Sequence, residues 1–165
     1  MTEGLLGDDP GGNVETSESV PDGFELLTFR SGFLGLIAPL YSLQDEDVLR
    51  LGFRCGPHHC NAGGMLHGGM LACYADFILT CGAIYHARLQ TSVITVNLSC
   101  DFVASAKPGD WIEGTVKVLR VTRSMVFVEG AVMVGDRQIL RTSGVLKIGV
   151  PVRHRWIRRT EPQPS

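Results

Sequence analysis

The sequence predicts an α+β domain in which a curled antiparallel sheet wraps around one long central helix. Two features point to this fold class. Residues 66–87 are apolar on every side over about six helical turns, which indicates a buried helix. From residue 92 the spacing of the apolar residues changes to a period of two, which is typical of strands. A sheet that curls around the helix would bury the apolar surfaces of both.

A strand is also expected before the helix. Residues 48–54 alternate well enough to be a strand, and they follow a turn signal, Asp-Glu-Asp, at residues 45–47. Residues 56–64 form a loop according to their Gly and Pro content. Residues 24–42 are interrupted by glycine and fit either a short helix or a segment that covers the core.

Four strands are expected after the helix. Residues 92–102 alternate between apolar and polar side chains, and the Lys-Pro-Gly-Asp sequence at residues 107–110 forms a turn. The other three strands are expected at residues 111–121, 124–134 and 138–148. The two connections between them are short enough for hairpins. We therefore expect the four strands to form an antiparallel meander.

The charges divide the 165 residues into three parts. The formal net charge is −2, but residues 1–29 hold seven acidic residues and no Lys or Arg, whereas residues 150–165 hold four arginines. We predict a disordered acidic leader at residues 1–23, one domain at 24–149 and a basic tail at 150–165. The leader has neither the basic start and apolar run of a secretory signal nor the arginines of a transit peptide. The tail could touch nucleic acid or an anionic membrane, but a solvated chain end is favoured, so no nucleic-acid partner is expected.

The cysteine count and the polar residues within the apolar stretch indicate where in the cell the protein is expected and whether it spans a membrane. Five cysteines, an odd number without a secretory signal, indicate reduced thiols in a cytoplasmic protein. His67, Asp76 and four glycines interrupt residues 64–84, so we expect a core helix rather than a membrane span.

One carboxylate and one histidine in the apolar stretch are candidates for chemistry. Asp76 could act as a general base or nucleophile, or it could be a structural carboxylate bonded to backbone amides. His67 lies nine positions earlier, a rotation of about 180° on a regular helix. Either His67 belongs to the loop and bends back, or the two residues serve different sites that two copies of the chain complete together.

A glycine pair follows the histidine. Gly68 and Gly69 would place bare N–H groups at a helix start, where the first donors have no partner within the helix and the dipole is positive. Such a site stabilises a developing oxyanion. The alternative is that both glycines only allow helix and strand to pack closely.

A second cluster raises the question of a metal. Cys55, His58, His59 and Cys60 are ligand types that zinc uses, but no second ligand pair lies at a suitable spacing, so we expect no metal. The sequence has no Walker A motif, no G-x-G-x-x-G motif after a strand and no G-x-S-x-G nucleophile elbow.

The spacing Asn61-x5-His67-Gly68-Gly69-x6-Asp76 on a strand–helix–sheet chain resembles the hotdog-fold acyl-CoA thioesterases. The resemblance is specifically to the branch of the phenylacetate-degradation and thioesterase superfamily member 2 types. It extends over residues 48–148 and includes the turn at residues 106–110. It implies a helix enclosed by an antiparallel sheet, with two protomers pairing their sheets edge to edge and often assembling further into a tetramer.

The resemblance also implies roles for individual residues. Asp76 looks like the catalytic carboxylate, which acts on water or on the thioester carbonyl, and Gly68 resembles the glycine whose N–H polarises that carbonyl. Asn61 and His67 match residues that the partner subunit supplies. Thr95 takes the place of a supporting serine, keeping the hydroxyl and adding a methyl group. A further set falls where the family often contacts the nucleotide end of coenzyme A, and comprises Arg120, Arg123 and Ser124.

These roles imply an enzyme that hydrolyses an acyl-CoA to a carboxylic acid and coenzyme A, with no cofactor beyond the coenzyme A of the substrate. The expected partners are the acyl-CoA and a second copy of the chain, in a homodimer or a dimer of dimers. The alternatives are a non-catalytic acyl-CoA or lipid-binding module and a dehydratase or hydratase on the same scaffold.

Overall fold

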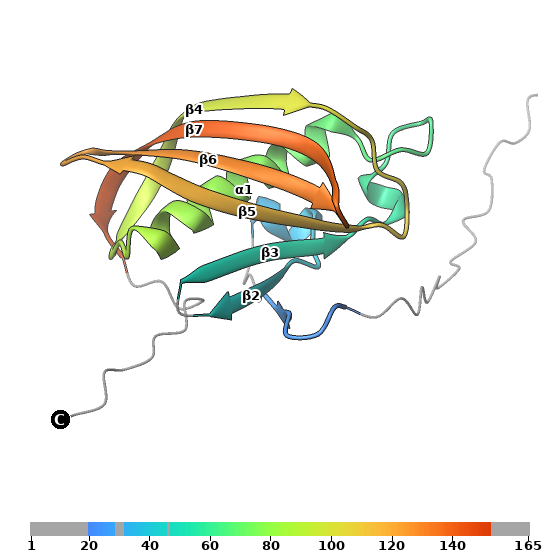
Figure 1. Ribbon diagram of the computed structural model, residues 1–165, viewed down its shortest axis with the longest axis horizontal. Helices are drawn as coiled ribbons and strands as arrows, with labels where there is room; N and C mark the ends of the chain where they lie inside the picture. Colours follow the sequence, from blue (N-terminus) through green and yellow to red (C-terminus); the bar gives the residue numbers. More distant parts are fainter. Residues whose placement is uncertain (1–19, 29–31, 46, 153–165) are drawn as a thin grey trace, which may run out of the picture.

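The computed structural model describes residues 20–28, 32–45 and 47–152. One helix, α1 (Gly68–His86), lies against a curled sheet of seven strands, and every neighbouring pair of strands is antiparallel (Figure 1). This confirms the predicted α+β fold class. Most of the leader and of the basic tail lies outside the described residues.

The strands differ in their order along the chain and across the sheet. Along the chain they are β1 (Glu25–Leu26), β2 (Tyr41–Asp45), β3 (Val48–Arg54), β4 (Thr91–Phe102), β5 (Trp111–Val121), β6 (Met125–Val134) and β7 (Arg137–Pro151). Across the sheet the order is β1-β2-β3-β5-β6-β7-β4. β4 therefore forms one edge of the sheet, although it follows the helix directly in sequence.

The predicted meander of four strands is wrong for its first member. β5, β6 and β7 do follow one another as antiparallel neighbours, but β4 pairs with β7, and β3 occupies the place beside β5. The reason is the connection formed by residues 103–110, which is too long for a tight hairpin. Its predicted turn is present, with the Asp110 N–H donating to the Lys107 carbonyl over 3.1 Å and a φ of 91° at Gly109. This length of chain passes from the edge of the sheet to its middle.

The segment of residues 24–42 contains more structure than expected. It forms β1, a 3-10 helix η1 (Phe33–Leu36) and the start of β2, so two strands extend the sheet beyond β3. The turn signal at residues 45–47 is confirmed as a hairpin, because Asp45 pairs with Val48.

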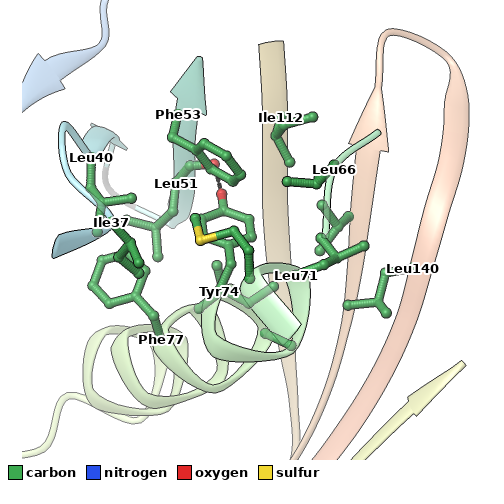
Figure 2. Close-up of a cluster of buried hydrophobic side chains, with 14 of the residues drawn as sticks. Ile37, Leu40, Leu51, Phe53, Leu66, Leu71, Tyr74, Phe77, Ile112 and Leu140 are labelled. Atoms are coloured by element: carbon green, nitrogen blue, oxygen red, sulfur yellow. Dashed lines mark hydrogen bonds between the residues drawn. The ribbon is translucent and has the colours of Figure 1, made fainter. Parts of the chain in front are cut away.

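The helix packs closely on the sheet because glycines on both elements make room. A Cβ atom at Gly114 of β5 would lie 2.8 Å from Ile78 and 3.2 Å from the Tyr74 hydroxyl, and one at Gly82 would lie 2.4 Å from Val116. The fully buried Tyr74 hydroxyl donates to the Leu51 carbonyl over 2.7 Å (Figure 2). This bond satisfies the one polar atom that the tyrosine brings into the core.

One side of the helix remains partly open, in contrast to the expectation of burial all round. Between the first residue of the helix and its last turn, the partly or fully exposed positions follow a helical spacing and are Gly69, Ala72, Cys73, Asp76 and Thr80. By length and composition α1 could cross a membrane, yet its other sides contact β3, β4, β5, β6 and β7 as the core helix of the domain. The sheet covers these sides and leaves one stripe to solvent.

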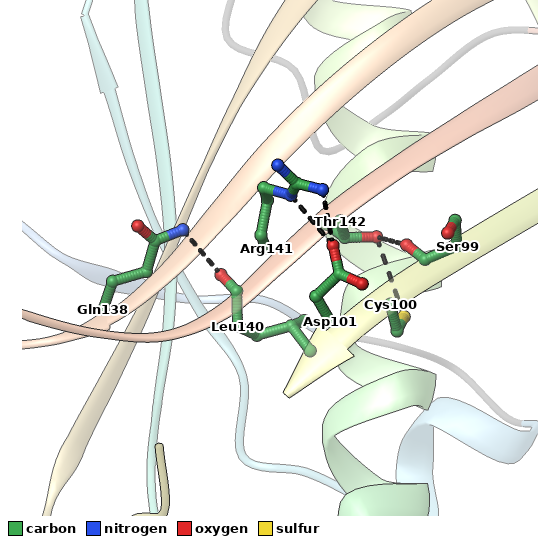
Figure 3. Close-up of polar contacts among 7 residues, drawn as sticks. All are labelled: Ser99, Cys100, Asp101, Gln138, Leu140, Arg141 and Thr142. Carbon is green, nitrogen blue, oxygen red and sulfur yellow. Dashed lines mark hydrogen bonds and ion pairs between the residues drawn. The ribbon is translucent and has the colours of Figure 1, made fainter. Parts of the chain in front are cut away.

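Polar contacts hold the edge strand β4 on β7 (Figure 3). The Arg141 guanidinium binds the Asp101 carboxylate at 2.8 Å, and the buried Thr142 hydroxyl donates to the Ser99 carbonyl at 2.8 Å. The free edge of β4 carries exposed apolar side chains, with Ile94 59% and Val96 58% exposed. A long, apolar, unpaired edge is a template for pairing with another chain.

Candidate functional site

The helix begins at a cap that His67 provides. His67 is the N-cap residue, in an extended conformation with φ −69° and ψ 132°, and its Nδ1 accepts a hydrogen bond from the Gly69 N–H over 2.8 Å. An Nδ1 that accepts carries no proton, so a neutral ring has its proton on Nε2. His67 is exposed, and its ring therefore offers an N–H donor to a ligand. Of the two sequence interpretations, His67 does lie outside the helix.

Gly68, the first residue of the helix, has space around it. A Cβ atom there would meet one neighbour within 4 Å, the Phe102 ring at 3.8 Å, which is an ordinary van der Waals contact. Its φ is not positive, so the backbone does not need glycine either. No described residue accepts a hydrogen bond from the Gly68 N–H. Close packing therefore does not explain this glycine, and its N–H at the start of the helix is open to solvent.

Gly69 has a different role. A Cβ atom at this position would lie 3.0 Å from Nδ1 of His67 and would crowd the capping bond. Its N–H is occupied by that bond, which leaves the Gly68 N–H as the open donor of the pair. The two glycines that looked alike in the sequence are thus distinguished by their surroundings.

Asn61 lies in a tightly bonded loop that leads into the cap. Its Oδ1 accepts from the N–H groups of Gly63 and Met65, over 2.9 and 3.3 Å. The oxygen is thus occupied, and the side-chain NH₂ group remains as a donor at an exposed position. The His67 N–H also donates to the His59 carbonyl over 2.9 Å, which ties the end of this loop to its start.

Asp76 lies on the open stripe of α1, where it meets the edge strand. The Thr95 hydroxyl of β4 donates to Oδ1 of Asp76 over 2.6 Å. A charge-assisted O–H···O⁻ bond of this length fixes the orientation of the carboxylate. Oδ2 remains available to accept a proton or a hydrogen bond from a ligand.

The structure separates the predicted residues into two groups. Asn61, His67 and Gly68 gather at the start of α1, beside the Phe102 end of β4. Asp76 and Thr95 lie about 12 Å further along the helix axis, at a rise of 1.5 Å per residue. Within one chain the His67 and Asp76 side chains therefore belong to separate groups.

The three residues expected at the nucleotide lie at the β5–β6 hairpin. Arg120 follows a bulge near the end of β5, and Arg123 and Ser124 are in the turn, all three exposed. This hairpin is at the opposite end of the sheet from the start of α1 (Figure 1). Within one chain it is therefore remote from Gly68.

The cysteine–histidine cluster has a structure of its own. His59 is buried, and its Nδ1 accepts from the Gly56 N–H over 2.9 Å, so this nitrogen holds the loop and is not available as a metal ligand. The sulfur atoms of Cys55 and Cys60 lie 3.8 Å apart. Within the described residues, no three His, Cys, Asp or Glu side chains converge as a metal site.

The buried His59 makes stability depend on pH. Burial, with the neighbouring His58, lowers the pKa of His59 from 6.5 to about 4. Between pH 6.5 and about pH 4, His59 is therefore protonated in the unfolded chain but neutral in the folded chain. We expect the free energy of unfolding to decrease as the pH falls through this window. His59→Asn, which keeps an acceptor for Gly56, should lose less stability between pH 6.5 and pH 4 in urea titrations than the wild type. The exposed His58→Asn should keep most of the wild-type slope, because burial is the larger cause of the lowered His59 pKa, and an equal slope in His59→Asn and the wild type would contradict the assignment.

The chain is similar to known thioesterases and esterases in sequence. A family model described as Thioesterase superfamily matches residues 63–140. A Pseudomonas aeruginosa protein named "Putative esterase PA0474" is 33% identical over 131 residues, which cover 79% of this chain and 98% of that protein.

Solved structures share the fold. Zebrafish thioesterase superfamily member 2 matches with a TM-score of 0.65 and 25% identity, over 72% of this chain and 87% of that one. A hypothetical thioesterase from Streptococcus pneumoniae, solved with coenzyme A, matches with a TM-score of 0.61 and 13% identity, over 69% and 88% of the two chains. At this lower identity the likeness concerns the fold alone.

Proposed function

Because the chain belongs to the thioesterase superfamily, we propose that it hydrolyses the thioester of an acyl-coenzyme A at a site that two copies of the chain build together. The observation that carries this proposal is the bond between the Asp76 carboxylate and the Thr95 hydroxyl at the open edge of the sheet. It gives a hydrolase of this family an oriented base beside a surface where a second copy can dock.

In the proposed reaction Asp76 activates water. Thr95 holds Oδ1, and Oδ2 takes a proton from a water molecule as the water oxygen attacks the thioester carbonyl. The C–S bond then breaks, and the departing thiolate of coenzyme A takes up the proton. The products are a carboxylic acid and the coenzyme A thiol.

Gly68 supplies the second element of the proposed mechanism. Negative charge develops on the carbonyl oxygen during the attack, and an N–H at a helix N-terminus stabilises it. The missing Cβ lets that oxygen approach closely. His67 Nε2 and the Asn61 amide add donors that can hold the thioester or the water.

A second copy of the chain would bring the two groups of residues together. We propose that the β4 edges of two copies pair antiparallel about a twofold axis near Ser99. Thr95 and Phe102 lie at similar distances on either side of such an axis, so Thr95 of one copy would lie opposite Phe102 of the partner subunit. Since Phe102 adjoins Gly68, Asp76 of one copy then faces Gly68 of the partner subunit.

We propose that the β5–β6 hairpin contacts the nucleotide end of the substrate. The exposed Arg120, Arg123 and Ser124 have side chains suited to phosphate groups. The coenzyme A in the pneumococcal structure supports a coenzyme A thioester as the substrate class.

We expect a cytoplasmic enzyme, in keeping with five free cysteines. We expect no cofactor apart from the coenzyme A of the substrate.

The test is a panel of short, long and aromatic acyl-CoAs with detection of the released thiol. Hydrolysis of at least one class supports the proposal. Binding of acyl-CoA without hydrolysis of any member would contradict it and favour a non-catalytic module. A change in the acyl group without thiol release would favour a dehydratase or hydratase.

Assembly is tested separately by light scattering. We expect a dimer or a dimer of dimers at micromolar concentration, held by an interface above about 1,000 Å². Ile94→Lys, on the apolar edge of β4, should weaken the interface. The control is Thr115→Lys, exposed on β5, which should leave assembly unchanged. Ile148→Lys on β7 is unsuitable as a control because it would disrupt the packed interior. A wild-type monomer would contradict the shared site.

A further inference from the structure

Two of the five cysteines lie in contact at the base of the loop that carries Asn61. Cys55 follows β3 directly and is 2% exposed, and Cys60 follows the 3-10 helix η2 (Pro57–His59) and is partly exposed. Their sulfur atoms are 3.8 Å apart. All five cysteines are within the described residues, and among these residues no other two thiols are in contact.

We infer that Cys55 and Cys60 are a site of reversible oxidation, which joins them in a disulfide and alters the loop that leads to His67. A disulfide needs a sulfur separation of about 2.0 Å, so the two atoms have to approach by about 1.8 Å. Only four residues, 56–59, lie between the cysteines along the chain, and the bond closes only this short loop. Disulfides are rare in reducing compartments, and those that do form there are usually transient and redox-sensing.

The oxidant we assign is a hydroperoxide, and the two thiols have unequal roles. The more exposed Cys60 sulfur attacks the peroxide, which gives a sulfenic acid and releases an alcohol or water. The Cys55 sulfur then displaces the hydroxyl group of that sulfenic acid, which leaves as water with the proton from Cys55. Two thiols and one hydroperoxide thus yield one disulfide, one water molecule, and the alcohol or second water molecule that the hydroperoxide releases.

Burial makes Cys55 the slower partner. It raises the pKa of the Cys55 thiol to about 12, with a further contribution from its contact with Cys60. A thiol with so high a pKa is almost entirely protonated near neutrality and does not react with peroxide first. It is suited to the second step, in which its partner sulfur is already adjacent.

The strain of closing the bond should fall on the loop. The backbone of Cys55 is fixed by two hydrogen bonds to the turn at Gly109 and Asp110, over 2.8 and 2.9 Å. Cys60 belongs to an isolated bridge with Leu66, and the next residue is Asn61. Movement of Cys60 therefore displaces the residues that the proposed function places near the thioester, and this consequence rests on that proposal.

The experiment separates the bond from its effect on turnover. The full-length protein is treated with hydrogen peroxide, and intact mass and peptide mapping are recorded before and after reduction by dithiothreitol. We expect the loss of two hydrogen atoms and a link between Cys55 and Cys60, both reversed by the reductant. Cys100→Ser should behave like the wild type, and neither Cys55→Ser nor Cys60→Ser should form the link.

The order of attack has its own readout. In Cys55→Ser, a sulfenic-acid probe such as dimedone should label residue 60, whereas in Cys60→Ser residue 55 should stay unlabelled. Oxidation to sulfinic acid without a link, or no reaction at the pair, would overturn the inference. Hydrogen exchange at residues 61–67 should change by at least about twofold on oxidation, and unchanged exchange would overturn the coupling to the loop. These readouts hold whether or not acyl-CoA is the substrate.

Discussion

Asp76→Asn is expected to lower thioester turnover by about 10²- to 10⁴-fold, the usual contribution of a positioned general base. The amide has nearly the volume of the carboxylate and can still accept from the Thr95 hydroxyl, so the fold should remain intact. It cannot take a proton from water. Steady-state kinetics with released-thiol detection would measure the loss in kcat, and circular dichroism would check the fold.

Two further measurements make the Asp76 result specific. Binding of acyl-CoA should change much less than turnover, because the proposed nucleotide contacts lie at the β5–β6 hairpin. Thr95→Ser keeps the hydroxyl and should retain most activity, whereas Thr95→Val removes the donor and should lose more. Near wild-type hydrolysis by Asp76→Asn would make the aspartate a structural residue.

Gly68→Ala is expected to lower turnover by at least about tenfold while leaving the fold unharmed. The new methyl group would obstruct the approach of the carbonyl oxygen to the Gly68 N–H, and the loss of one oxyanion contact is worth about 10²- to 10³-fold. Among the described residues outside its own turn of helix, that methyl group would meet Phe102 at 3.8 Å, an ordinary van der Waals contact, so no steric strain is expected. The free energy of unfolding should stay constant or rise by up to about 1 kcal/mol, because alanine favours the helix.

This combination of lower activity with equal or higher stability is what distinguishes a ligand contact from a packing glycine. Gly35→Ala, at a glycine whose added Cβ would likewise meet no close contact, is the matched control and should not affect turnover. If Gly68→Ala unfolded more readily and lost activity in proportion, the glycine would be structural.

The sequence was sufficient to predict the helix, most of the strands and the turns between them. The expected helix at residues 66–87 corresponds to α1 at Gly68–His86, and the strand expected at residues 111–121 matches β5 at both ends. These elements depend on local patterns of apolar residues and on turn residues such as Gly109 and Gly135, whose φ values are positive.

What the sequence could not predict depends on distant pairing. The position of β4 at the edge is set by its register with β7, which no local pattern reveals. β1 and β2 are too short to show the alternation by which β4 was found.

Of the site, the residues were predictable but not their surroundings. The spacing drew attention to His67, Gly68 and Asp76, yet it could not separate the open Gly68 from the capping role of Gly69. The structure also pairs Asp76 with Thr95, a contact between helix and edge strand that the sequence alone left as an analogy.

The central claim, that one site contains Asp76 of one copy and Gly68 of the partner subunit, is tested most directly by mixing two inactive variants. Asp76→Asn and Gly68→Ala would be unfolded together, refolded in equal amounts and assayed beside each variant refolded alone. If sites are shared, half of the dimers are mixed and each holds one unaltered site, so turnover should recover to about a quarter of the wild-type value. If the mixture is no more active than the average of the two variants, each chain builds its own site and the account is wrong.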